Sequence, residues 1–313
     1  MIWYLILFIA SALLLAKSGT MTVKSLTKIA EYLKWKKFIV ASLIMGFVSS
    51  APELFVGITA AINNKPQLSF GNIIGSNMLL LTLVIGISVL WGGKVLLKGV
   101  FMKRSYFYIA FYALLPLILM ADGAINRVDG IILIISLVFY LKELREIQSR
   151  YKEELNTDEP IGKASFKQIG ILLLAIVLMV LSAQGIVFAA TRLALQLNLS
   201  LVLIGLLVVA VGTSLPEIAF GLRSAMMNQK EMLLGNVFGS IVVNSALVLG
   251  ITALIAPFKI FNPGFYVTSL IFTILSVLLF IIFSKTHEAV TKKEAKVLVG
   301  VYVLYFIFQL IIN

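Results

Sequence analysis

The sequence predicts an all-α membrane protein of ten transmembrane helices, arranged as two inverted five-helix repeats. Three observations predict this fold. The 313 residues are 60% hydrophobic and only 13% charged, whereas about a quarter of the residues in a soluble domain are charged. Residues 46–86 and 210–250 align without a gap at an offset of 164, and thirteen of the 41 positions match. Basic residues also gather in alternate connectors between the apolar segments.

Ten segments are apolar and long enough to approach the roughly 20 residues that a spanning helix needs. The first segment has no basic stretch before it and no small-residue cleavage site, so it is predicted to be a helix rather than a cleaved signal. The predicted helices lie near 2–16 (continuing to about 34), 38–62, 69–92, 104–121, 129–144, 167–190, 200–227, 231–256, 265–284 and 294–312.

The basic residues predict the orientation in the membrane. Of the 26 Lys and Arg residues, 22 fall on one face of the predicted helices and four on the other, namely Lys65, Arg127, Arg192 and Lys259. Basic connectors are retained in the cytoplasm, so we expect a multi-pass cell-membrane protein with both termini outside. This bias also explains the net charge of +12 without a nucleic-acid partner.

Five spans in each half make the second half start on the opposite face, which inverts one copy relative to the other. The predicted parts are a first five-helix repeat (1–144), a cytoplasmic linker (145–166) and a second, inverted repeat (167–313). The linker mixes acids and bases, which is typical of a solvated connector, although a regulatory loop is an alternative. His287 lies in a charged connector, and we expect it to be a solvated loop residue.

Each copy contains one acidic residue inside an otherwise apolar segment, Glu53 or Glu217, directly after a proline. Proline lacks an N–H and clashes with the carbonyl four residues earlier, so each helix should bend and release main-chain oxygens. Carboxylates are costly in hydrocarbon and usually face an ion path. Hard cations such as Ca²⁺ take about six to eight oxygen ligands, and two carboxylates balance one divalent ion.

A second element follows in each copy, with the pattern G-N-x-x-G-S at residues 71–76 and 235–240. Small residues let membrane helices approach closely, and the serines Ser76 and Ser240 can add hydroxyl ligands. Asn72 and Asn236 can act as ligands, or cap or cross-link helices. Capping is the favoured interpretation because Asn is a strong cap former.

Other classes of function fit the sequence less well. Two acids could do general acid–base chemistry, but the chain shows no nucleophile–base set, no His-rich motif and no cysteine. We therefore expect no enzyme activity and no covalent cofactor. A channel or a membrane scaffold is a third class, but a duplicated segment with one acid per copy is typical of a secondary transporter. We expect the transporter to be a monomer.

At these motifs the chain resembles the cation/calcium antiporter superfamily, specifically the compact prokaryotic sodium/calcium exchangers. That family has paired α-repeats of the form G-T-S-x-P-E followed by G-N-x-x-G-S. Residues 212–217 match the first motif fully and residues 48–53 match it closely. The resemblance implies antiport of Ca²⁺ against Na⁺ by alternating access, in which the long first and sixth helices, about 2–34 and 167–195, slide across a fixed core.

The resemblance also implies the ligands of the transported ions. Glu53 and Glu217 would bind Ca²⁺ and help to bind the counter-ion, with Ser49 and Thr213 as close calcium ligands. Flanking sodium sites would form from Ser50 with Ser76 and from Ser214 with Ser240. The remaining implied ligands are the carbonyls of Gly46 and Ala210 and the side chain of Asn244.

The chain departs from the family pattern at three positions. Members usually carry Asn or Asp four residues after the serine of G-S, but the first copy has Leu80, which cannot bind a cation, and Val48 replaces a glycine. The second copy has the neutral Asn244, as in proton/calcium exchangers, whereas its S-x-P-E motif is similar to the sodium branch. Burial disfavours a charged carboxylate and so favours its protonation. A proton/calcium exchanger is therefore an alternative. An exchanger for another divalent ion, such as Mn²⁺ or Mg²⁺, is a further alternative. Lys17 is interpreted either as snorkelling to the interface or as a tethered cation.

Overall fold

The computed structural model describes residues 2–32, 45–96, 100–150, 166–227, 230–260, 263–286 and 289–312, and these are helical almost throughout. The elements of the first half, including one π-helix and one 3₁₀ turn, are α1 (Ile2–Tyr32), α3 (Met45–Ser49), α4 (Ala51–Ile62), α5 (Pro66–Leu79), η2 (Leu80–Val84), α6 (Ile85–Gly92), β1 (Val95–Leu96), α7 (Val100–Leu119), η3 (Met120–Asp122), β2 (Ala124–Ile125) and α8 (Arg127–Arg150).

The elements of the second half are α9 (Phe166–Leu197), α10 (Leu201–Ile204), the π-helix η4 (Gly205–Val209), α11 (Ala210–Thr213), α12 (Leu215–Met226), α13 (Lys230–Val242), the π-helix η5 (Val243–Val248), α14 (Leu249–Ile255), β3 (Phe258–Lys259), α15 (Pro263–Thr286), β4 (Ala289–Val290) and α16 (Lys292–Ile312). From α11 onward the second half follows the order of the first half from α3 onward, without a counterpart of η3 among the described residues. The helices α4 and α12 both have 12 residues and begin at the same position of the repeated segment.

Each predicted apolar segment coincides with a helix or a series of consecutive helices in the described part of the chain. Residues 38–44 of the second predicted segment lie outside it, and α8 continues to Arg150 instead of ending near residue 144. Six stretches are long and apolar enough to cross a membrane, and a bent pair of helices, Leu201–Thr213 with Leu215–Met226, makes a seventh candidate. The six are Ile2–Thr22, Pro66–Gly92, Gln168–Leu197, Leu233–Ile255, Pro263–Thr286 and Lys292–Ile312. The chain is therefore a multi-pass membrane protein.

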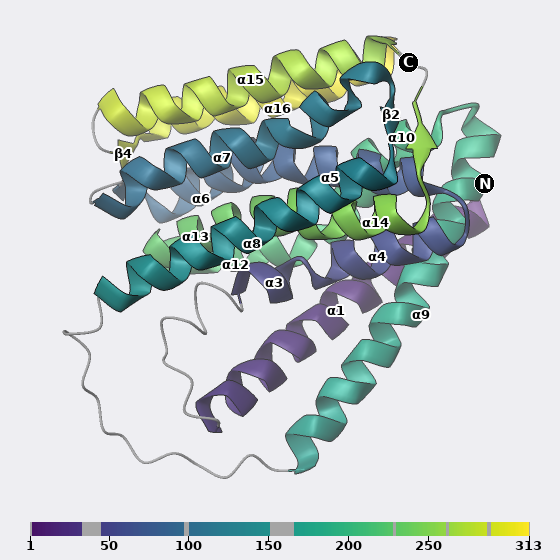
Figure 1. Cartoon of the computed structure of the whole chain (residues 1–313), viewed down its shortest axis with the longest axis horizontal. Coiled ribbons are helices and arrows are strands. Elements are labelled where there is room, and N and C mark those ends of the chain that lie inside the picture. Colours follow the sequence, from purple (N-terminus) through teal and green to yellow (C-terminus); the bar gives the residue numbers. More distant parts are fainter. Residues whose placement is uncertain are drawn as a thin grey trace.

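Four short strands, which the sequence did not predict, tie the two halves together. β1 pairs antiparallel with β4, and β2 pairs antiparallel with β3. The strands β4 and β2 lie at opposite ends of the helices (Figure 1). Each strand has only two residues, so none could produce the alternating pattern by which a strand is recognised in a sequence.

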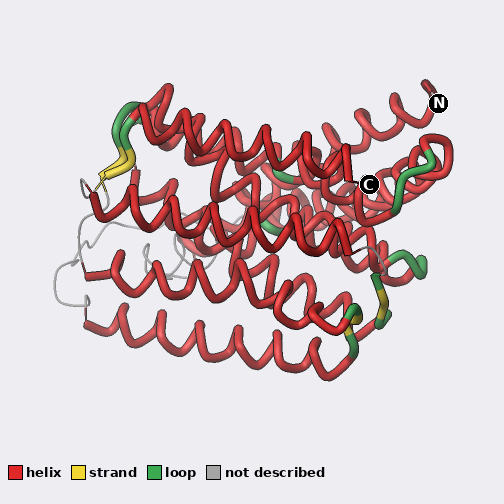
Figure 2. Tube along the Cα trace, turned by 90° about the horizontal axis from the view of Figure 1, so that it is seen from above, coloured by secondary structure: helices red, strands yellow, loops and turns green. Residues whose placement is uncertain are grey.

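The helices form layers. Figure 1 shows α15 and α16 along one side, α6 and α7 beneath them, and α1 and α9 on the opposite side, and Figure 2 shows the helices running between the same two ends. The chain termini lie toward one common end of the helices (Figure 1). Many large apolar side chains face outward, among them Trp3, Leu173 and Ile271, as expected where lipid replaces water around the protein.

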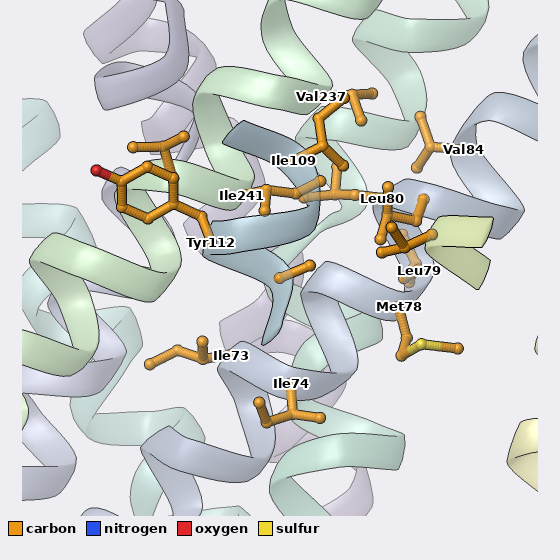
Figure 3. Close-up of a cluster of buried hydrophobic side chains, with 14 of the residues drawn as sticks. Ile73, Ile74, Met78, Leu79, Leu80, Val84, Ile109, Tyr112, Val237 and Ile241 are labelled. Carbon is orange, nitrogen blue, oxygen red and sulfur yellow. The ribbon is translucent and has the colours of Figure 1, made fainter. Parts of the chain in front are cut away.

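Two apolar clusters hold the layers together. One cluster joins α1 to α9 through residues such as Leu15, Met179 and Ile186. The larger cluster is centred on α5, η2 and α13 and is shown in part in Figure 3, where Leu80 lies near Leu79 and Val84. The repeated segments therefore lie inside the protein, covered by the other helices.

Candidate functional site

The two acidic residues sit at breaks between helices. Glu53 lies in the first turn of α4 and Glu217 in the first turn of α12. Ser50 (φ −80°, ψ 5°) separates α3 from α4, and Ser214 (φ −85°, ψ 7°) separates α11 from α12. The two sites therefore have nearly the same backbone, and the breaks lie where the prolines predict them. A helix N-terminus carries partial positive charge, which favours a carboxylate at this place.

Both carboxylates are buried, with 0% of Glu53 and 1% of Glu217 exposed. Ser214, at the break that precedes Glu217, donates to Glu53 Oε1 at 3.3 Å, so the fold brings the helix breaks of the two copies together. This arrangement is what the repeated motif predicted. An unpaired buried charge is strongly unfavourable, which means that the pair needs a cation, a proton or hydrogen-bond donors nearby.

The carboxylate of Glu53 lies among hydroxyl groups of the second copy. Ser214 Oγ donates to Glu53 Oε1 at 3.3 Å and lies 3.0 Å from Ser76 Oγ. The hydroxyl of Thr213, the residue before Ser214, donates to Asn72 Oδ1 at 3.0 Å. Asn72 is therefore a cross-link between α5 and α11, and the expectation that it caps a helix is wrong, because it lies in the middle of α5.

A second pair of serines consists of Ser49 and Ser240, whose hydroxyl oxygens are 2.8 Å apart. Asn236 also lies within a helix, α13, so it does not cap one either. Like the Ser76–Ser214 pair, the Ser49–Ser240 pair joins the two copies. The expected sodium sites paired Ser50 with Ser76 and Ser214 with Ser240, whereas the hydrogen bonds in the structure join other partners. These bonds do not test which groups bind an ion.

The carbonyls expected to act as ligands are already engaged. Gly46 accepts from the Ser50 N–H at 3.3 Å and from Ser49 Oγ at 3.3 Å. Ala210 accepts from the Ser214 N–H at 3.0 Å and from Thr213 Oγ1 at 3.4 Å. Both carbonyls thus lie directly beside the breaks, where their hydroxyl partners could rotate toward an ion.

Several buried polar atoms of the site have no hydrogen-bond partner in the described part of the chain. They are Ser50 Oγ, Glu53 Oε2, both oxygens of Glu217, Asn72 Nδ2, Asn236 Nδ2, Asn77 Oδ1 and both side-chain polar atoms of Asn244. Buried polar groups are normally paired, so such a concentration calls for an explanation. Six of these atoms are oxygens, the type of ligand that hard cations prefer.

The residues described contain no group of three His, Cys, Asp or Glu that could hold a metal ion. A cation between Glu53 and Glu217 would therefore take most of its ligands from neutral oxygens. The hydroxyls and amides named above are the available source. This donor set suits a cation that prefers oxygen over nitrogen or sulfur.

Close backbone contacts explain the two glycines of the second motif in the first copy, Gly71 and Gly75. A side chain at Gly71 or Gly75 would collide with the backbone of Val202 or Leu206, respectively. A Cβ atom at Gly46 would lie 2.9 Å from the Cα of Gly239. These contacts press the helices of the two copies together and set the spacing of the polar groups between them.

Sequence reasoning missed one polar contact beside the site. Asn77 Nδ2 donates to Ser245 Oγ at 2.8 Å, and both residues are buried. Ser245 follows Asn244 in η5, and the residue that matches it in the first copy is Leu81. The signal was weak, because a lone serine in a membrane helix most often bonds to its own helix.

Two further predictions concern Lys17 and His287. Lys17 is exposed on α1, which fits a side chain that reaches toward the interface rather than one held in the site. His287 lies outside the described residues, so its prediction is untested.

Comparison with known proteins identifies the family. A sequence profile described as "Sodium/calcium exchanger protein" matches residues 3–142 and 167–311. The putative antiporter CaxA of Alkalimonas amylolytica is 30% identical over 80% of this chain and 81% of its own length. The sodium/calcium exchanger MaX1 of Methanosarcina acetivorans is 26% identical over 94% of each chain.

A solved structure shares the fold. The sodium-calcium exchanger NCX_Mj, in crystals soaked with Na⁺ and Sr²⁺, superposes with a TM-score of 0.68 over 97% of each chain at 24% sequence identity. The two matched ranges cover both copies of the motif and leave out the connector between them. The chain belongs to the sodium/calcium exchanger protein family.

Proposed function

We propose that this protein is a secondary active antiporter that exchanges Ca²⁺ for Na⁺ across the membrane. The observation that carries the proposal is the pair of buried carboxylates, Glu53 and Glu217, one from each copy of the repeat. Membership in the sodium/calcium exchanger family supports it, as do relatives named as an antiporter and as a sodium/calcium exchanger. The ions are transported substrates, and the protein needs no covalent cofactor.

Exchange of Ca²⁺ for Na⁺ follows if a single site binds either ion, but not both at once. Two carboxylates neutralise one Ca²⁺, and hydroxyl and carbonyl oxygens complete the roughly six to eight ligands that Ca²⁺ takes. The proposed ligands are Glu53, Glu217, Ser49, Thr213, Ser50, Ser214, Ser76, Ser240, Asn244 and the carbonyls of Gly46 and Ala210. An empty site would leave two bare charges in a low dielectric, which makes it unfavourable for the empty protein to change sides. Only loaded states then cross, which couples the two fluxes.

The proposed topology is ten spans, as two inverted five-helix repeats (1–144 and 167–313) joined by a cytoplasmic linker (145–166). The repeated order of elements supports it. The strand pairs support it as well. The first strand of each half pairs with the second strand of the other half, β1 with β4 and β3 with β2. The distribution of Lys and Arg favours both termini outside a cell membrane.

The helices α1 and α9 are the proposed moving elements. They pack along each other on one side of the protein, and α1 meets the core at small residues. Gly212 lies against Ala12 and Phe8 of α1, and Gly19 of α1 lies against Pro52, where a Cβ atom would come within about 3.3–3.4 Å of its neighbours. Contacts between small residues beside both helix breaks would let α1 and α9 slide along the core. This motion would open the ion site alternately to each side of the membrane.

The test is transport by the purified protein in proteoliposomes. We expect an outward Na⁺ gradient to drive uptake of ⁴⁵Ca²⁺, and both Glu53→Gln and Glu217→Gln to abolish it. Asp122→Asn is the matched control, because it makes the same acid-to-amide change at an exposed turn. Replacing the Na⁺ gradient by a pH gradient distinguishes a proton exchanger, and competition by Mn²⁺ or Mg²⁺ tests the choice of divalent ion. Undiminished uptake in both Gln variants would refute the proposed site.

A further inference from the structure

The helix α1 carries two lysines on its outer face. Lys17 and Lys24 are both exposed and lie seven residues apart. Seven residues are almost two full turns of an α-helix, so the two side chains leave the helix on nearly the same side. Two exposed apolar residues, Ile6 and Leu13, continue this line toward the start of the helix. The outer face of α1 therefore changes from apolar to basic between Leu13 and Lys17.

The two lysines point away from the rest of the protein. Leu15, Ser18 and Thr22 are buried on the other side of the helix, where α1 packs on α9 and on the core. Figure 1 shows α1 together with α9 at one side of the molecule. The face that carries Lys17 and Lys24 is therefore the one that meets the lipid.

Lys17 lies within the membrane span. The apolar stretch of α1 that is long enough to cross a membrane runs from Ile2 to Thr22, and Lys17 is its only charged residue. Thr22 follows five residues later, which is about 7.5 Å of helix rise. A bare ammonium in hydrocarbon is costly, so a lysine at this depth extends its side chain toward the headgroups. Lys24 lies two residues beyond the stretch and reaches the same layer.

The side chains that the structure describes supply no counter-charge for these lysines, because none of their carboxylates forms an ion pair with Lys17 or Lys24. The lipid leaflet at this end of α1 is the remaining source. Lysine ammonium groups bind phosphate as point charges, and an anionic headgroup carries no cation of its own that would compete. The exposed Leu13, one turn before Lys17, offers an apolar surface for the acyl chains.

We propose that the outer face of α1 binds an anionic phospholipid, with Lys17 and Lys24 contacting its headgroup and Leu13 its acyl chains. The site itself does not depend on what the protein transports. Its effect on transport rests on the proposed function, in which α1 slides along the core. A headgroup that stays paired with Lys17 would spare the moving helix an unpaired ammonium at the edge of the hydrocarbon, and so would speed transport.

Binding is measured directly on the full-length protein in detergent. Native mass spectrometry counts the phosphatidylglycerol or phosphatidylcholine molecules that stay bound and gives the affinity for each lipid. We expect phosphatidylglycerol to bind more tightly. Lys17→Gln should weaken its binding about fivefold, equivalent to about 1 kcal/mol, and the double variant with Lys24→Gln about 25-fold. Lys17→Arg keeps the charge and should keep the affinity.

The matched control is the double variant Lys292→Gln with Lys296→Gln, which removes two exposed lysines from the start of α16. It makes the same change in net charge on a different helix and should leave the affinity for phosphatidylglycerol unchanged. An equal loss in the two double variants would show a diffuse attraction to the whole charged surface and would overturn the proposed site. Equal affinities of the natural protein for the two lipids would overturn it as well.

Proteoliposomes test the effect on transport. Replacing about one third of the phosphatidylcholine by phosphatidylglycerol should raise the initial rate of Na⁺-driven ⁴⁵Ca²⁺ uptake by the natural protein, but not by the Lys17→Gln, Lys24→Gln variant. An equal response of the two proteins would contradict a role of the bound lipid in the motion of α1. No uptake in either membrane would refute the proposed function, whereas the lipid binding measured in detergent would still support the site.

Discussion

The two copies of the repeated segment have the same backbone at the helix break but use their polar side chains differently. Ser50 and Ser214 differ by only 5° in φ and 2° in ψ. Yet Ser214 donates to Glu53, whereas Ser50 Oγ and both oxygens of Glu217 have no partner among the described residues. The second copy therefore supports the carboxylate of the first, but the first does not support that of the second.

The difference shows that a duplicated motif fixes the position of the main chain more strictly than the properties of the site. The matching residues set the breaks, the close helix contacts and the two carboxylates. Other positions of the two copies carry different residues. Leu80 aligns with Asn244 and Leu81 aligns with Ser245, so this segment is apolar in the first copy and polar in the second. Separate substitutions in the two copies can show whether this asymmetry matters for transport and stability.

The largest expected effect follows from changing the two acids separately. Glu53→Gln and Glu217→Gln should each lower Ca²⁺ transport more than 100-fold, equivalent to about 2.7 kcal/mol. Their stabilities should differ: in Ca²⁺-free buffer Glu217→Gln should be the more stable variant by about 1–3 kcal/mol, because it removes the less well-paired of the two buried carboxylates. Thermal unfolding in detergent measures this difference. Equal unfolding temperatures would show that the two carboxylates are equally well paired.

The glycines test the backbone contacts of the two copies. Gly71→Ala should destabilise the protein by about 3 kcal/mol, because its Cβ atom would collide with the Val202 backbone and the helices must move apart. Gly235 occupies the same place in the second copy, but no described atom lies within 4 Å of its Cβ position. Gly235→Ala should therefore change the free energy of unfolding by less than about 1 kcal/mol. The same loss in both variants would contradict the asymmetric packing.

The serines at the breaks test the hydrogen bonds directly. Ser214→Ala should lower Ca²⁺ affinity about tenfold, equivalent to about 1.4 kcal/mol, and should destabilise the ion-free protein because Glu53 and Ser76 both lose a partner. Ser50→Ala should lower Ca²⁺ affinity to a similar extent if Ser50 is a ligand, but leave the ion-free protein unchanged. Isothermal titration with Ca²⁺ and thermal unfolding separate the two effects. Destabilisation by Ser50→Ala would mean that its hydroxyl is paired after all.

The smallest expected effect concerns the polar contact that the sequence did not indicate. Ser245→Ala should cost about 0.6 kcal/mol, a typical value for a hydrogen bond between membrane helices, because Asn77 loses its acceptor. Ser18→Ala is the control, since that buried hydroxyl bonds back to Leu15 of its own helix. Its replacement should change stability less. The reverse order would show that the Asn77–Ser245 contact contributes nothing.

Most of the fold was predictable, because a membrane forces apolar helices of a fixed length on the chain. The helix positions, the breaks before Pro52 and Pro216 and the burial of both acids were all predicted. The cross-pairing of the four short strands was not, since two residues carry no periodic signal. The sequence also could not show that Asn72 bonds to Thr213 or that Ser49 faces Ser240, because such contacts depend on rotamers and on helix spacing. The polar segment around Asn244 and Ser245 lies in a π-helix, which shifts the facing of side chains relative to an α-helix and often marks functional sites.

An experimental density map of the protein soaked with Ca²⁺ and then with Na⁺ would locate the transported ions directly. We expect one divalent ion between the two copies, with an oxygen of Glu53 and an oxygen of Glu217 each about 2.3–2.6 Å from it. After exchange, Na⁺ should occupy positions near the serine pairs, with none beside Leu80. A Ca²⁺ peak elsewhere, or two carboxylates that point away from each other toward lipid, would contradict the proposed site.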